Sequence, residues 1–116
     1  MISFEFGDVL LLSAFPYSNL GTSKKRPALL LADTGDRDIV VARITSESSR
    51  DAYDLEIDDW KTAGLLVPSV IRCSKVATVS RGTVIKKLGR LGSPSRRKIR
   101  SVLKKLFDLA SSSHAP

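Results

Sequence analysis

The chain has 116 residues, which suits one compact domain with a modest core and excludes a multidomain enzyme. Hydrophobic residues make up 42% and charged residues 27%, so we expect a folded globular protein rather than a disordered or fibrous one. Lys and Arg number 19 against 12 Asp and Glu, a net charge of +7 that favours a polyanionic partner such as nucleic acid.

The positive charge is concentrated in the second half of the chain. Residues 1–60 hold 6 basic and 11 acidic side chains, whereas residues 61–107 hold 13 basic and no acidic ones. We therefore expect the late segments to attract a polyanion.

The cellular compartment can be predicted from cysteine use and apolar runs. Cys73 is the only cysteine, so no internal disulfide can form, and we expect it to be a small core residue. No apolar run approaches the roughly 20 residues that cross a bilayer, and the N-terminus lacks the pattern of a signal peptide. We expect a complete cytoplasmic protein that does not associate with membranes.

Short apolar and β-branched segments predict strands in the first half of the chain. Residues 8–14 form an apolar run that ends before Pro16, and residues 17–26 are polar, as in an exposed loop. Residues 27–33 and 39–44 flank a turn-forming segment and predict a hairpin. Residues 53–57 alternate apolar and acidic side chains, which indicates a strand with one solvated face.

The second half begins with a short helical turn and continues with further strands. Residues 58–63 are predicted to form the turn, anchored by Trp60 and ended by Gly64. Three further strands are predicted at residues 67–72, 75–79 and 83–87.

A C-terminal helix is predicted at residues 94–109, with Ser93 as N-cap and Pro94 as the first helical residue. Apolar residues recur at helical spacing from Ile99 onward, and most of the basic residues fall off that stripe. This basic face is either a solvated surface or a phosphate-binding one. Residues 1–110 are expected to form one domain and residues 111–116 a disordered tail.

The residue inventory excludes several catalytic designs. The only histidine, His114, lies near the C-terminus, so a Ser-His-Asp triad cannot form, and one Cys with one His cannot build a zinc site. A phosphate-binding G-x-x-x-x-G-K-[ST] motif is absent. Catalysis must therefore use Arg, Lys, hydroxyls and carboxylates. These groups suit RNA cleavage by the RNA's own 2′-hydroxyl, which requires no cofactor.

Four segments together resemble the MazF/PemK family of toxin endoribonucleases in order and spacing. They are Gly7-Asp8-Val9, Lys24-Lys25-Arg26-Pro27-Ala28, Val40 to Ser46 (VVARITS) and Ser69-Val70-Ile71-Arg72-Cys73. The resemblance extends over about residues 5–107. It implies a mainly β fold, a twisted antiparallel sheet curled into an SH3-like barrel of the PemK/CcdB type with a C-terminal helix.

The resemblance also implies the function of a toxin in a type II toxin–antitoxin system. The expected activity is metal-independent, sequence-selective cleavage of single-stranded RNA that leaves 2′,3′-cyclic phosphate and 5′-hydroxyl ends. The expected partners are an acidic antitoxin and a second copy of the chain, with operator DNA contacted only through the antitoxin.

The resemblance assigns roles to individual residues. It implies that Arg26 contacts the scissile phosphate, that Thr45 lies beside it and that Arg72 acts as general acid. The expected RNA-binding residues are Lys24, Lys25, Ser46, Ser74 and Lys75.

Ser74 departs from the family pattern, because some members carry at this position an aspartate proposed as general base. Glu47 is either a substitute base or an ordinary solvated acid.

Two other functions stay open at this stage. One is a barrel that binds nucleic acid without cutting it and acts as a co-repressor with its antitoxin. The other is a protein-binding SH3-like module, which an aromatic content of only 6% disfavours.

Overall fold

The computed structural model describes residues 3–15 and 25–108 of the chain. In this part of the chain, six β-strands precede one α-helix, and a short 3₁₀ turn (η1, Arg81–Thr83) joins the last two strands. The strands are β1 (Asp8–Leu12), β2 (Arg26–Asp33), β3 (Asp38–Thr45), β4 (Asp54–Glu56), β5 (Val70–Ser80) and β6 (Val84–Arg90), and the helix is α1 (Ser93–Leu106).

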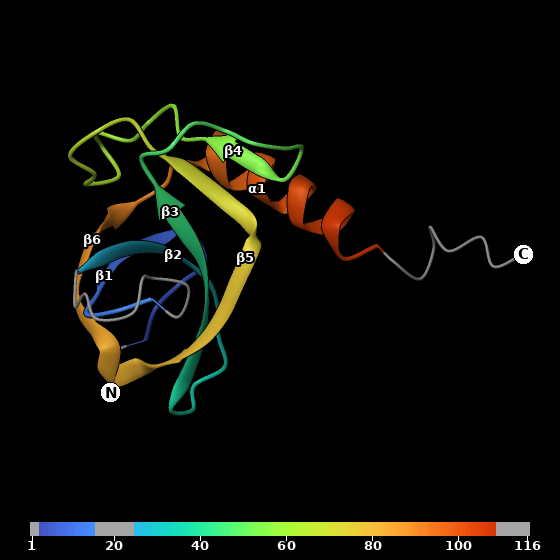
Figure 1. The fold of residues 1–116 in the computed structure, drawn as a ribbon. Helices are drawn as coiled ribbons and strands as arrows, with labels where there is room; N and C mark the ends of the chain where they lie inside the picture. The colour runs from blue at the N-terminus through green and yellow to red at the C-terminus, as the bar shows by residue number, and fades with distance from the viewer. Residues whose placement is uncertain (1–2, 16–24, 109–116) are drawn as a thin grey trace, which may run out of the picture.

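The strands form one antiparallel sheet with the order β4-β5-β3-β2-β1-β6. Figure 1 shows that the sheet curls into a barrel-like shape and that α1 lies outside it, alongside β4 and β5. The barrel is open because β4 and β6 are the two edges of the sheet. The predicted fold class, mainly β with a C-terminal helix, is confirmed.

The two strands predicted at residues 67–72 and 75–79 are one continuous strand, β5. On the neighbouring strand, Arg43 pairs with Arg72 and the adjacent Ala42 pairs with Val76, so residues 73–75 have no counterpart on β3. This bulge places Ser74 in solvent without ending the strand. The bulge contains Ser74 and Lys75, the polar pair that suggested a break between two strands.

Two buried apolar clusters stabilise the fold. One cluster lies between the sheet and α1 and includes Ile71, Cys73, Leu91 and Ile99. The other includes Leu12 of β1, Leu30 of β2 and Val41 of β3. Cys73 is fully buried, as predicted, and this burial raises the pKa of its thiol to about 11.

The start of α1 differs by one residue from the prediction. Gly92 is the N-cap, and Ser93 is already helical. The hydrogen bonds at this end come from a distant segment: Asp59 accepts one from the Gly92 backbone N–H (2.7 Å) and one from the Ser95 hydroxyl (2.6 Å). Asp59 belongs to the predicted turn before Gly64, whose φ of +88° agrees with its role as the residue that ends the turn.

The other end of α1 is shorter than predicted. The helix ends at Leu106 rather than at residue 109, and Phe107 has left helical geometry with 64% of its surface exposed. The predicted tail at residues 111–116 lies outside the described residues. Within the described part, α1 has neither the length nor the apolar composition needed to span a membrane.

Candidate nucleic-acid interface

A cavity of about 550 Å³ lies between the ends of β2 and β3, strand β6 and the loop that carries Leu65 and Leu66. Four basic side chains line it, and no described acidic residue does. We call this cavity the cationic pocket; its cations are Lys25, Arg26, Arg43 and Lys86. Such a surface favours a phosphate-bearing ligand.

The register of the sheet brings these residues together. Leu11 in β1 pairs with Pro27 on one side and with Lys86 on the other, which brings the start of β2 close to β6. On the other side of β2, Ala28 pairs with Arg43. Arg26 and Thr45 lie two residues beyond this pair, at the start of β2 and the end of β3, and both line the cationic pocket.

Arg26 has free hydrogen-bonding capacity. Its Nε atom is buried without a hydrogen-bond partner, and the guanidinium makes no ion pair with any described residue. A guanidinium whose N–H groups have no protein acceptor can donate them to the oxygens of an anion. Arg26 is therefore well suited to bind phosphate.

Thr45 is 9% exposed and lies in the same pocket. Its Oγ1 accepts a hydrogen bond from the backbone N–H of Glu47 (3.2 Å). Because this contact uses only a lone pair of the hydroxyl, the hydroxyl proton can be donated to a ligand oxygen.

Arg72 does not line the cationic pocket. Its side chain is 1% exposed and pairs with two carboxylates, through Nη1 with the fully buried Asp54 and through Nη2 with Glu47 (2.9 Å). The hydrogen bond and charge of Arg72 hold the pKa of Glu47 below its ordinary value, so Glu47 is ionised at neutral pH. The structure thus brings together Arg26 and Thr45, and places Arg72 in a separate ion-pair network.

The predicted RNA-binding residues are also divided. Lys25 and Ser46 line the cationic pocket. Ser74 and Lys75 lie in the bulge of β5 and do not line the cationic pocket. Lys24 lies outside the described residues. No described group of His, Cys, Asp or Glu side chains is arranged to hold a metal ion.

Two cations of the pocket were missed in the sequence. Arg43 had a local signal, because it lies two residues before Thr45 and alternate residues of a strand share a face. Lys86 had no such signal, since only the pairing of β6 with β1 brings it near β2.

Residues 5–107 match the family described as PemK-like, MazF-like toxins of type II toxin–antitoxin systems. The chain belongs to this family. The match covers the whole sheet and α1, including the cationic pocket. No curated protein sequence matches the chain.

Solved structures of similar fold include several toxins of this family. The Mycobacterium tuberculosis toxin MazF-mt6 superposes with a TM-score of 0.71 at 21% identity, covering 87% of this chain and 96% of that one. MazF from Deinococcus radiodurans gives 0.70 at 17% identity, covering 93% and 99%. A mycobacterial endoribonuclease in complex with its cognate antitoxin gives 0.71 at 16% identity, covering 90% and 94%. At these identities the likeness establishes a shared fold.

Proposed function

We propose that this MazF/PemK-family protein is the toxin of a type II toxin–antitoxin system and a metal-independent, sequence-selective endoribonuclease acting on single-stranded RNA. The observation that carries the proposal is the cationic pocket: Arg26, which forms no ion pair with a described residue, and Thr45 both line it, and no described carboxylate does. Such a pocket can hold the phosphodiester and stabilise the extra negative charge of its transition state.

In the proposed reaction, the 2′-hydroxyl oxygen attacks the adjacent phosphorus and the bond to the 5′-oxygen breaks. The products are a 2′,3′-cyclic phosphate and a 5′-hydroxyl. The guanidinium of Arg26 holds the non-bridging oxygens, and Thr45 donates a hydrogen bond to one of them. One proton leaves the 2′-hydroxyl and one reaches the 5′-oxygen. The role of Arg72 as donor of the second proton stays a prediction.

The proposal includes the partners implied by the family. Among the structures of similar fold, one is described as a mycobacterial endoribonuclease in complex with its cognate antitoxin and another as MazE-MazF from Deinococcus radiodurans. We propose that an acidic antitoxin neutralises the cationic pocket, that the toxin is a cytoplasmic homodimer, and that operator DNA is contacted through the antitoxin.

The decisive experiment maps the cleavage ends of a long defined RNA in excess EDTA. We expect cuts at a recurring sequence with cyclic phosphate ends. Arg26→Ala should slow cleavage by about 10²- to 10³-fold, as the loss of one hydrogen-bond donor to the transition state does in other enzymes. Arg26→Lys should recover only part of the rate, because lysine lacks the two-pronged guanidinium.

Arg97→Ala is the matched control, because Arg97 is an exposed arginine of α1 outside the cationic pocket. The Arg97→Ala variant should cleave RNA at the wild-type rate. Intact RNA after long incubation with antitoxin-free protein would refute the proposed activity.

The second candidate function is a non-cleaving barrel that binds nucleic acid as a co-repressor. The observation that favours it is the position of Arg72, buried between two carboxylates and outside the cationic pocket. This candidate predicts salt-dependent RNA binding with the RNA left unchanged.

A further inference from the structure

A second cavity of about 390 Å³ adjoins the cationic pocket. Ser46 and Ser69 line both cavities, so the two are immediate neighbours. The second cavity has the opposite chemistry, because it contains an aromatic ring and carboxylates rather than cations. We call it the aromatic pocket; its distinguishing residues are Trp60, Glu47, Glu56 and Asp58.

Trp60 offers a stacking surface. The side chain is half-buried and packs against the core cluster between the sheet and α1, which fixes the ring. The indole N–H has no hydrogen-bond partner among the described residues. The exposed Lys61 places its Nζ over the ring, 5.6 Å from the centroid, a cation–π contact that a stacking base would displace. A ring held in this way at a pocket wall can stack against an unpaired nucleobase.

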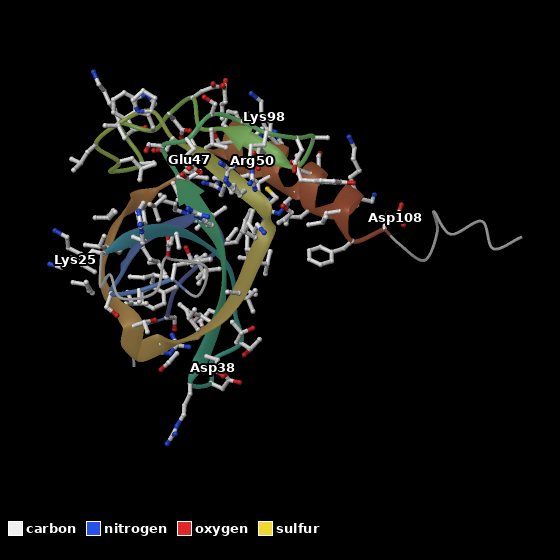
Figure 2. The ribbon with its side chains drawn as sticks, viewed as in Figure 1. Lys25, Asp38, Glu47, Arg50, Lys98 and Asp108 are labelled. Carbon is white, nitrogen blue, oxygen red and sulfur yellow. The ribbon has the colours of Figure 1, made fainter. Side chains whose placement is uncertain are left out.

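Two of the three carboxylates form ion pairs with cations, and each retains a free acceptor oxygen. Arg72 binds Oε1 of Glu47 (2.9 Å), and Lys98 binds Oδ2 of Asp58 (3.2 Å). Glu56 forms no ion pair with any described residue. Figure 2 shows Glu47 and Lys98 at the same end of the molecule, away from Asp38. Ionised carboxylates only accept hydrogen bonds, so this pocket repels phosphate and favours N–H donors.

From these contacts we infer that the aromatic pocket binds one nucleobase of the RNA whose phosphate occupies the cationic pocket, and that it selects a base carrying an amino group. Cytosine, adenine and guanine donate amino hydrogen bonds to the carboxylates. Uracil presents two carbonyl oxygens beside its single N–H, and these oxygens face like charge. The inference rests on the proposed function for the identity of the ligand, and it makes Glu56 and Trp60 residues that determine sequence specificity.

A binding experiment without cleavage tests this inference. Trp60 is the only tryptophan, so its fluorescence reports directly on the aromatic pocket. The probes are deoxyribonucleotide hexamers of cytosine, adenine or uracil, which lack the attacking 2′-hydroxyl. Kd values from saturable quenching should be about tenfold lower for cytosine and adenine than for uracil, in line with the discrimination of one well-placed base contact.

Glu56→Gln removes the charge with little change in shape, and Glu56 is exposed, so the variant should fold normally. The ratio of the uracil Kd to the cytosine Kd should fall severalfold. Asp38→Asn, at an exposed position at the far end of the barrel, is the control and should keep the wild-type ratio. Equal Kd values for uracil and cytosine, or an unchanged ratio in Glu56→Gln, would overturn the inference.

This result does not depend on the proposed activity. A protein that binds cytosine preferentially but leaves RNA intact would refute the nuclease and retain the base-binding pocket. A protein that cleaves RNA but binds the three hexamers equally in the fluorescence titration would support the nuclease and refute the base-binding pocket.

Discussion

Arg26 and Arg72 carry the same guanidinium group in opposite electrostatic surroundings. Arg26 lies in a pocket without described carboxylates and forms no ion pair with a described residue. Arg72 is 1% exposed and pairs with Asp54 and Glu47. A free guanidinium can bind a substrate phosphate, whereas one that is already paired stabilises its own network. The neighbouring carboxylates therefore leave the two guanidinium groups with different capacity to bind a phosphate.

Thr45→Val should lower the cleavage rate by about 10- to 100-fold, because valine keeps the shape but cannot donate a hydrogen bond to the charged phosphate. Thr45→Ser retains the hydroxyl and should stay within a few-fold of the wild type. Single-turnover cleavage of a short RNA measures both variants. Equal rates for Thr45→Val and the wild type would remove the hydroxyl from the mechanism.

Arg72→Ala should lower the free energy of unfolding by about 3–5 kcal/mol, because the carboxylate of Asp54 would stay buried without its counter-ion. Urea denaturation followed by circular dichroism measures this loss. The double variant Arg72→Met with Asp54→Leu removes the buried charges together and should recover part of the lost free energy of unfolding.

If Arg72 donates a proton in the reaction, this folded double variant should cleave RNA at least about 10²-fold more slowly than the wild type. Cleavage at the wild-type rate would exclude Arg72 as general acid.

At the scale of elements, the turn at residues 58–64 links the sheet to α1. Asp59 accepts hydrogen bonds from the Gly92 N–H and the Ser95 hydroxyl, so a residue distant in sequence supplies the acceptor for donors at the helix N-terminus. The same turn carries Trp60 into the aromatic pocket and is followed by Leu65 and Leu66 of the cationic pocket. The stability of α1 and the shape of the candidate site thus depend on one segment.

Asp59→Ala should destabilise the protein by about 1–2 kcal/mol, because the Gly92 N–H and the Ser95 hydroxyl lose their acceptor. Thermal denaturation at neutral pH measures this effect. Asp58→Ala is the control, since the Asp58 side chain makes no ion pair with a described residue except the exposed one with Lys98, and its effect should stay below about 1 kcal/mol. Equal losses in the two variants would contradict the capping role.

At the scale of the whole molecule, the acidic first half of the chain neutralises part of the basic second half. Seven ion pairs among the described residues join a first-half acid to a second-half cation: Arg72 pairs with Glu47 and Asp54, Arg81 with Asp33, Lys87 with Asp8, Arg90 with Glu5 and Asp8, and Lys98 with Asp58. The cationic pocket has no described acid in its lining. Its positive potential therefore arises from where the acids are placed as much as from the net charge of +7.

RNA binding should weaken with salt, with a slope of about −3 for log K against log salt concentration, because four cations would each displace counter-ions from a single strand. Fluorescence anisotropy with a labelled deoxyribonucleotide hexamer measures the slope. Lys86→Ala should reduce its magnitude by about 0.7, whereas Lys104→Ala on the exposed face of α1 should leave it unchanged. A slope that Lys86→Ala does not alter would exclude this lysine from the contact.

The sequence alone determined the family, the mainly β fold with its C-terminal helix, and Arg26 and Thr45 as candidates. These conclusions rest on local patterns, namely strand alternation, helical spacing and short motifs such as Lys24 to Ala28. Only the tertiary structure joined Lys86 to Arg26, enclosed Arg72 between two carboxylates and set Asp59 at the start of α1. Strand register and contacts between distant segments decide these placements, and a single sequence holds no local signal for either.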